Sequence, residues 1–158
     1  MREFWASVLF VIFLDRLTKN LIYKNLKLYQ KIKILPFLNL TKVWNPGVVF
    51  GSFSSFNGID KFLPLILVIF LVGLFLYSYF FVKERLKLIC LGLIFGGGTS
   101  NLIDRLVWGK VLDFVDLHFK GYHWYTFNIA DLAITLGVIG FLFLGIKNQK
   151  VEGKANVS

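Results

Sequence analysis

Residues 62–82 form an apolar run that no charged residue interrupts. A helix needs roughly 20 mostly apolar residues to cross the hydrocarbon core of a bilayer, and this run is long enough. The whole chain is also unusually apolar, because 56% of its 158 residues are hydrophobic and 17% are charged. An ordinary soluble domain is about 25% charged. The sequence therefore predicts an integral membrane protein that forms one compact domain.

Three other apolar segments become long enough to cross a membrane once the polar residues at one end of each are counted. The N-terminal segment resembles a secretory signal but lacks a cleavage site of small residues, so we expect it to remain as the first span. We predict four spans, at about residues 4–22, 62–82, 86–104 and 127–146, with extramembrane segments at about 23–61 and 105–126.

The polar ends of the first, third and fourth spans are predicted to lie at the same face of the membrane, because consecutive spans alternate in direction. The polar residues in these ends are Asp15, Arg16, Lys19, Asn101, Asp104, Arg105, Asn128 and Asp131. Ionisable residues within membrane segments are costly and usually functional. The net charge of +9 lies in loops and tails, where anionic lipid headgroups rather than nucleic acid are the expected counterpart.

Both extramembrane segments contain stretches that alternate between two faces, as strands do. In the first segment, Ile32–Trp44 predicts a strand in a small sheet on the membrane, with turns at Pro46-Gly47 and Asn57-Gly58. In the second, Val111–Lys120 predicts a strand with Asp113 on its apolar face. A carboxylate on a buried face needs a partner or a function. If this stretch is helical, that argument weakens.

Two polar groups on the predicted helices have both a structural and a functional interpretation. Asp15 and Lys19 have the i, i+4 spacing of an ion pair, which could anchor a helix end or serve a site. Asn101, Asp104 and Arg105 share a face of the third span and follow a glycine run that permits close helix approach. This group could lock the bundle or form part of a site.

Asp113 and Asp131 have apolar sequence neighbours and no adjacent basic residue. If the two carboxylates meet, like-charge repulsion and poor solvation raise one pKa, and the pair holds a shared proton near neutral pH. One carboxylate can then take a proton from water while the other protonates the substrate. This arrangement predicts an aspartic peptidase. Asp131 could instead be an acidic residue that only stabilises a helix N-terminus.

Other hydrolytic chemistries fit the sequence less well. Asp116, His118 and His123 could form a metal site, but the HExxH spacing is absent and interfacial histidines are more often surface groups. Ser100 could be a nucleophile, but it does not lie in a G-x-S-x-G turn. We therefore expect no metal and no cofactor.

Two hypotheses come from other functional classes. A small transporter or channel could use Asp15, Asp104 and Asp131 as a proton or cation path, because intramembrane carboxylates permit it. That hypothesis predicts ion flux and gives Asp113 no necessary role. A purely structural membrane subunit predicts that replacing Asp113 or Asp131 with Asn leaves function unchanged.

Four sequence blocks carry a resemblance to a known family. They are Asp15-Arg16-Leu17-Thr18-Lys19; Asn45-Pro46-Gly47-Val48-Val49-Phe50-Gly51; Gly96-Gly97 through Asn101-Leu102-Ile103-Asp104-Arg105; and Val111-Leu112-Asp113-Phe114 followed by Phe127-Asn128-Ile129-Ala130-Asp131. In this order and spacing, the chain resembles the lipoprotein signal peptidases, also called signal peptidase II, along nearly its whole length. Each block is weak alone, and together they are specific.

The resemblance implies a bacterial inner-membrane aspartic endopeptidase that cuts prolipoproteins before a diacylglyceryl-modified cysteine. It implies an all-α bundle of four transmembrane helices with a small extracytoplasmic β-sheet and a short second extracytoplasmic loop. Both termini would be cytoplasmic and the site would lie at the outer face. The implied partners are prolipoproteins and membrane lipids but not nucleic acid, and we expect a monomer.

The resemblance places the catalytic pair on Asp113 and Asp131, the pair that the local sequence also favours. It implies supporting or substrate-binding roles for Asp15, Asn45, Gly47, Asn101, Asp104, Arg105 and Asn128. We assign Lys19, which is spaced to pair with Asp15, to the same supporting group. Val49 and Ser100 depart from the family pattern, which usually has Ala and Gly at these positions. Both are small-residue positions near the substrate path, so packing and substrate preference can differ here.

Overall fold

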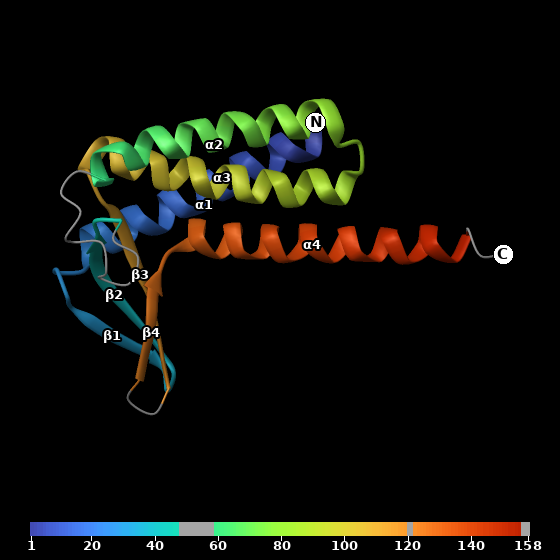
Figure 1. Cartoon of the computed structure of the whole chain (residues 1–158). Helices are drawn as coiled ribbons and strands as arrows, with labels where there is room; N and C mark the ends of the chain where they lie inside the picture. The colour runs from blue at the N-terminus through green and yellow to red at the C-terminus, as the bar shows by residue number, and fades with distance from the viewer. Residues whose placement is uncertain (48–58, 120–121, 156–158) are drawn as a thin grey trace.

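The computed structural model describes the fold of residues 1–47, 59–119 and 122–155 (Figure 1). Val49 and the turn predicted at Asn57-Gly58 lie outside these residues. In chain order, the elements are α1 (Arg2–Asn25), β1 (Lys31–Leu35), β2 (Leu38–Asn45), α2 (Ile59–Phe81), α3 (Arg85–Trp108), β3 (Val111–Phe119), β4 (Tyr122–Phe127) and α4 (Ile129–Ala155).

The four helices form a bundle in which α3 contacts each of the other three (Figure 1). Among the described residues, three helical segments are long and apolar enough to cross a membrane: Phe62–Phe81 of α2, all of α3, and Ile129–Lys147 of α4. The apolar sequence of α1 is interrupted by charged residues, although α1 is as long as α3, at 24 residues each. The chain is therefore a multi-pass membrane protein.

Glycines bring the helices of the bundle into backbone contact. A Cβ atom at Gly96 of α3 would lie 3.0 Å from the carbonyl oxygen of Val8 in α1. On another face of the same helix, a Cβ at Gly97 would lie 2.5 Å from the carbonyl oxygen of Ala130 in α4. The glycine run thus holds α1 and α4 against α3 at the end of the bundle where the polar residues lie.

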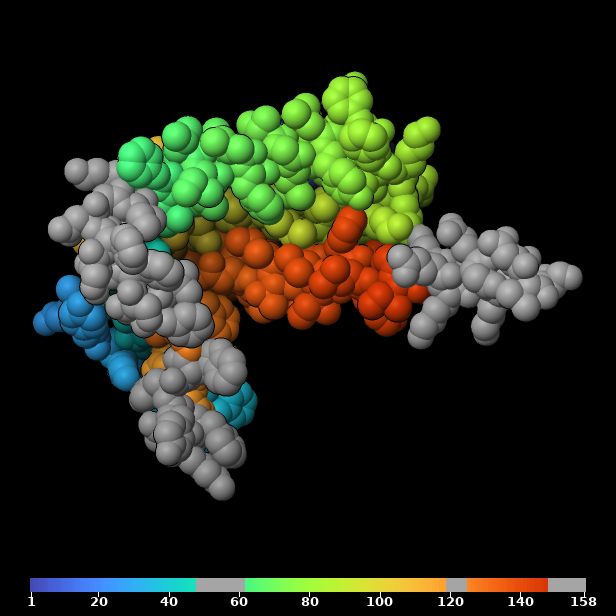
Figure 2. Space-filling model, viewed as in Figure 1, coloured from blue at the N-terminus to red at the C-terminus, as the bar shows by residue number. Residues whose placement is uncertain are grey.

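From Phe62 to Phe81, the helix α2 is apolar on all sides and largely exposed in the isolated chain. Its large side chains Ile69, Phe70 and Phe80 are each more than half exposed. A helix that is hydrophobic all round and unburied by protein needs an apolar solvent, which the bilayer supplies. The space-filling view shows α2 and α4 on either side of α3, with the sheet projecting from one end (Figure 2).

The four strands form one antiparallel sheet in the order β1-β2-β3-β4. The strand predicted at Ile32–Trp44 is wrong as a single element, because a turn at Pro36-Phe37 divides it into β1 and β2. Pro36 has no backbone N–H to donate to a ladder, which favours a turn there. The strand predicted at Val111–Lys120 is confirmed as β3 (Val111–Phe119).

The second extramembrane segment is more than a short loop, because it supplies both β3 and β4 to the sheet. The sheet is attached to the bundle by a small apolar cluster of Ile22 of α1 and Leu26, which follows that helix, with Leu112 and Phe114 from β3. This contact fixes the start of β3, and with it Asp113, beside the polar ends of the helices.

Candidate active site

Two acidic and two basic side chains form a buried ion cluster between α1 and α3. The Nζ atom of Lys19 lies 2.7 Å from Oδ2 of Asp15 and 2.8 Å from Oδ2 of Asp104. Arg16 pairs with the same two carboxylates from the other side. Asp15, Lys19 and Asp104 are at most 1% exposed. The opposite charges are equal in number, so the cluster compensates itself inside a poorly solvated region.

The ion cluster also fixes the elements that surround it. Asp15 Oδ1 accepts a hydrogen bond from the backbone N–H of Ala130 at 3.0 Å, which ties α1 to the start of α4. Asp104 Oδ2 accepts one from the backbone N–H of Leu112 at 3.3 Å, which ties α3 to β3. Ser100 donates to Asp15 Oδ2 at 2.6 Å. Asp15 and Asp104 are thus engaged by ion pairs and hydrogen bonds that join α1, α3, β3 and α4, which favours a structural role over an ion path through them.

Asn128 connects the two predicted catalytic carboxylates. Its Nδ2 atom donates to Oδ1 of Asp113 at 2.7 Å, and its backbone N–H donates to Oδ2 of Asp131 at 3.2 Å. Its Oδ1 atom accepts from the backbone N–H of Asp131 at 3.0 Å, so the two residues cap the start of α4 reciprocally. The helix cap therefore places Asp131 next to β3 and Asp113.

Two further asparagines bind the remaining carboxylate oxygens. Asn45 Nδ2 donates to Asp113 Oδ2 at 2.9 Å, and Asn101 Nδ2 donates to Asp131 Oδ1 at 2.8 Å. No ion pair involves Asp113 or Asp131 among the described residues, whereas Asp15 and Asp104 each pair with both Arg16 and Lys19, and Asp116 pairs with Lys31. The structure thus brings together Asp113 and Asp131, the pair predicted from the sequence. The side chains that donate hydrogen bonds to their carboxylates are neutral amides.

Asp113 is 1% exposed, and its environment favours the protonated form. Burial, and then the negative charge of Asp131, raise the pKa of Asp113 to about 7. The hydrogen bonds from Asn45 and Asn128 act in the opposite direction but do not cancel this effect. Near neutral pH, Asp113 is therefore divided between its acidic and basic forms, which a group that exchanges protons with a substrate requires.

Asn101 is oriented by two donors on its amide oxygen. Lys19 Nζ and Asn128 Nδ2 both donate to Asn101 Oδ1, at 3.1 and 3.2 Å. The amide nitrogen of Asn101 must therefore face Asp131. The sequence placed Lys19 in the site, and the structure shows that it contacts the carboxylate pair through Asn101.

Arg105 lies beside the same group, with Nη1 donating to the carbonyl oxygen of Asn101 at 3.3 Å. Its Nε atom is buried and has no acceptor among the described residues. Gly47 lies next to the guanidinium with φ +95°, and a Cβ atom there would approach Leu63 to 2.7 Å. Both the backbone conformation and the space therefore require glycine at this position.

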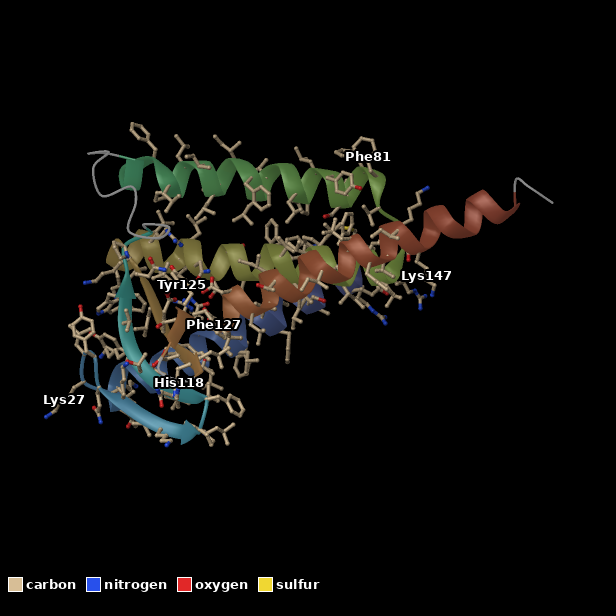
Figure 3. The ribbon with its side chains drawn as sticks, turned by 60° about the horizontal axis from the view of Figure 1, so that its bottom comes forward. Lys27, Phe81, His118, Tyr125, Phe127 and Lys147 are labelled. Carbon is tan, nitrogen blue, oxygen red and sulfur yellow. The ribbon has the colours of Figure 1, made fainter. Side chains whose placement is uncertain are left out.

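Two cavities flank the aspartate pair. One, of about 310 Å³, is mostly apolar and is lined by Asp131 together with Leu117, Phe127, Leu132 and Thr135. The other, of about 300 Å³, is lined by Asp113 together with Val43, Trp44, Asn45 and Thr126. Tyr125 lines both. Figure 3 shows Tyr125 and Phe127 at the junction between the sheet and the bundle.

Sequence reasoning missed Tyr125, because nothing distinguishes it from the other interfacial aromatic residues until the pairing of the strands is known. Asp116, predicted on a polar strand face, is 2% exposed and accepts a hydrogen bond from Asn39 at 3.1 Å. Among the described residues, no group of three His, Cys, Asp or Glu side chains is arranged to hold a metal ion. The side chain of His123 lies outside the described residues.

Similarity to solved structures shows the class of protein to which this chain belongs. The fold matches two solved structures, both described as bacterial membrane enzymes. One superposes with a TM-score of 0.83 at 30% identity, covering 93% of this chain and 94% of the other. The second has a TM-score of 0.79 at 32% identity, covering 94% and 90%. The chain therefore has the fold of a bacterial membrane enzyme.

The sequence comparisons define the family. The family model for signal peptidase (SPase) II matches residues 7–147. A lipoprotein signal peptidase of Thermodesulfovibrio yellowstonii is 40% identical over 141 residues, or 89% of this chain and 92% of the relative. One from Coxiella burnetii (strain RSA 493) is 43% identical over 137 residues, or 85% and 83%. The chain belongs to the signal peptidase II family and is a membrane peptidase.

Proposed function

We propose that this peptidase is an aspartic endopeptidase that removes signal peptides from bacterial prolipoproteins, cutting before a diacylglyceryl-modified cysteine. The proposal rests on one observation above all, which is that Asn128 holds Asp113 and Asp131 together while no cation among the described residues pairs with either. The relatives named lipoprotein signal peptidase support the substrate class.

The chemistry follows from the different protonation of the two carboxylates. Asp131, as the base, takes a proton from a water molecule whose oxygen attacks the carbonyl carbon of the peptide bond. Asp113, in its protonated form, transfers its proton to the carbonyl oxygen, so a neutral diol forms. The intermediate collapses when the proton on Asp131 passes to the leaving nitrogen and Asp113 recovers its own proton from the diol.

The surrounding polar residues have supporting roles in this proposal. Arg105 and the backbone of Gly47 lie at the edge of the pair, where they can bind the substrate backbone. Asn45, Asn101 and Asn128 orient the two carboxylates. The ion cluster of Asp15, Arg16, Lys19 and Asp104 holds the helix ends in place and does not contact the substrate.

We further propose that α1 is a fourth membrane span, because it is as long as α3 and lies against it through the α3 glycines. An even number of spans leaves both termini on one side, which we assign to the cytoplasm. The site and the sheet then lie at the outer face of the inner membrane. The substrate and surrounding lipids are the partners of a monomer that binds no nucleic acid.

The direct test is cleavage of a diacylglyceryl-modified precursor by the purified protein in detergent, compared with Asp113→Asn and Asp131→Asn. We expect cleavage before the modified cysteine by the wild type and loss of at least about 1,000-fold in kcat for both variants. Asp116→Asn is the matched control, because it changes a buried carboxylate on the same strand away from the pair, and it should retain activity. Cleavage by either dyad variant at the wild-type rate contradicts the mechanism.

A further inference from the structure

Tyr125 occupies the point where the two cavities beside the aspartate pair meet. It is the residue shared by the linings of the Asp131 cavity and the Asp113 cavity among the described residues. A peptide that crosses the aspartate pair must pass from one cavity into the other. A peptide bond held at the aspartate pair therefore lies next to the Tyr125 side chain, which Figure 3 labels where the sheet meets the bundle.

The hydroxyl group of Tyr125 is part of the hydrogen-bond network of Asp113. Asn45 uses its two amide hydrogens on Tyr125 Oη and on Asp113 Oδ2, so the phenol and the carboxylate lie side by side. The orientation of Asn45 is fixed, because its Oδ1 atom accepts from the backbone N–H of Gly47 at 2.9 Å. Asn45 is thus a clamp that positions the phenol relative to Asp113.

This arrangement leaves the phenolic proton free for a substrate. Tyr125 Oη accepts a hydrogen bond from Asn45, and its own proton has no acceptor among the described residues. A phenol has one donor hydrogen, and a substrate carbonyl beside Asp113 can accept it. Burial, and then the charge of Asp113, raise the pKa of Tyr125, so the proton stays in place across the working range of the aspartate pair.

We propose that Tyr125 is a further catalytic residue, whose hydroxyl donates a hydrogen bond to the carbonyl oxygen of the peptide bond that is cut. The inference rests on the proposed aspartic mechanism. The hydrogen bond polarises the carbonyl and shares the negative charge that develops on its oxygen before Asp113 delivers its proton. No covalent bond to Tyr125 forms or breaks, and the phenol keeps its proton throughout.

The same contact explains why an exposed aromatic ring occupies this position. Tyr125 is 48% exposed and lies at the end of the sheet, where an apolar ring alone would gain little from burial. The ring forms the wall between the cavities, while the hydroxyl group reaches the carbonyl. Removing the hydroxyl should therefore affect turnover, and removing the ring should also affect binding.

The test is steady-state kinetics of Tyr125→Phe with the lipidated precursor, in parallel with the wild type. We expect kcat to fall about 10- to 100-fold, with KM changed less than about twofold, because the lost interaction acts mainly on the transition state. Tyr29→Phe, which removes a hydroxyl from an exposed tyrosine in the turn before β1, should keep the wild-type kcat. Tyr125→Ala should in addition raise KM.

A second measurement separates this inference from the proposed function. A peptide inhibitor with a secondary alcohol at the cleavage position mimics the diol, and its deoxy analogue lacks the hydroxyl. Tyr125→Phe should weaken the alcohol about tenfold or more and leave the deoxy analogue unchanged. If Tyr125→Phe keeps wild-type kcat while Asp113→Asn and Asp131→Asn are inactive, the role of Tyr125 is wrong and the dyad stands. If the wild type does not cut the precursor, both are wrong.

Discussion

At the scale of single residues, the carboxylates at this end of the bundle lie in two different electrostatic settings. Asp15 and Asp104 contact the cations of Lys19 and Arg16, so their negative charges are compensated. Asp113 and Asp131 accept hydrogen bonds from uncharged amides instead. An amide stabilises a carboxylate less than a cation does, which leaves the pair able to hold and release a proton.

The pH dependence of activity should therefore report Asp113. In the mechanism above, Asp113 must be protonated, and its pKa is raised to about 7. As pH rises through this value, the active form is lost, so kcat/KM should fall about tenfold per pH unit on the alkaline side. A pH–rate profile measures this limb. A profile that stays flat up to pH 9 contradicts the assignment of Asp113 as the acid.

The stability of the protein should change with pH for the same reason. Because the folded-state pKa of Asp113 is raised above the unfolded value, the folded state binds this proton more tightly. Its contribution to stability is fully present below about pH 4 and is lost as pH rises through about 7. Asp113→Asn carries no charge, so its stability relative to the wild type should increase by about 1–3 kcal/mol between pH 5 and pH 8.

Thermal unfolding in detergent at the two pH values measures this difference. Asp116→Asn serves as the control, because Asp116 lies on the same strand but is paired with Lys31 at 3.6 Å. Parallel stability curves for the wild type and Asp113→Asn would mean that Asp113 is charged throughout.

Lys19 should be essential for the stability of the bundle as well as for the site. Lys19→Met leaves the buried carboxylates of Asp15 and Asp104 with one cation, Arg16, and so with an uncompensated charge. Breaking such a buried network costs about 3–5 kcal/mol. Lys24→Met removes an exposed lysine near the end of the same helix and should cost little. Equal melting temperatures for the two variants would contradict the structural role of Lys19.

At the scale of elements, the position of the catalytic groups depends on the packing of α4 against α3. Gly97 lies under Ala130, next to the first turn of α4 that carries Asp131. A methyl group there must push α4 away from α3, and overpacking of this kind costs about 1–3 kcal/mol. Gly97→Ala should lower both the melting temperature and the cleavage rate, because it separates Asp131 from Asn101.

Gly73 offers a matched control in α2, since a Cβ atom there meets nothing within 4 Å. Gly73→Ala should be neutral or stabilise the helix by up to about 1 kcal/mol. The test is to measure the melting temperature and the cleavage rate of Gly97→Ala and of Gly73→Ala. An active and fully stable Gly97→Ala variant would show that α3 and α4 can separate without loss, contrary to the packing described here.

A helix or strand could be predicted from the sequence when one local pattern, such as an apolar run or an alternation of residue types, was enough to identify it. The apolar run of α2 and the alternation of β3 were sufficient, because membrane thickness and strand pleating leave few alternatives. The hairpin of β1 and β2 was not recognised, since alternation continues across Pro36 and the turn there contains no glycine. The strand β4 was missed because its six residues pair with β3 rather than showing a pattern of their own.

The candidate site was predictable only in part for a related reason. Asp113 and Asp131 stood out because charged residues in apolar segments are rare. The hydrogen bonds from Asn45, and the place of Tyr125 between the cavities, depend on strand register. Register follows from contacts between segments far apart in the sequence, such as the pairing of Val43 with Asp113. Local sequence patterns do not reveal which residues of distant segments are in contact.

At the scale of the whole molecule, positive charge is concentrated on the surface around the sheet. Lys24, Lys27, Lys31 and Lys33 are exposed there. The acidic side chains described at this end are buried or half-buried within the ion cluster, the sheet and the aspartate pair. The sheet therefore presents a basic surface next to the membrane, which should attract anionic lipid headgroups.

An aromatic cluster of Tyr23, Trp44 and Trp108 lies where α1 and α3 reach the sheet. The rings of Trp44 and Trp108 are 5.3 Å apart, and Tyr23 stacks on Trp108 at 6.0 Å. Lys42 Nζ lies 4.2 Å from the Tyr23 ring, and Lys110 Nζ lies 4.9 Å from the Trp44 ring. Amphipathic rings with ammonium groups beside them suit the headgroup layer, where rings meet acyl chains and cations meet phosphates.

Anionic lipid should therefore stabilise the protein through Lys42 and Lys110. In nanodiscs, replacing phosphatidylcholine with phosphatidylglycerol should raise the melting temperature, since each lysine near such a surface contributes about 1 kcal/mol of attraction. The double variant Lys42→Gln, Lys110→Gln should lose most of this increase, and added salt should weaken it in the wild type because exposed charges are screened. The control is Lys83→Gln, Lys147→Gln, which removes the same charge from exposed positions at the opposite end of the bundle, where Figure 3 labels Lys147. If both double variants lose the lipid effect equally, net charge rather than the aromatic cluster determines lipid binding.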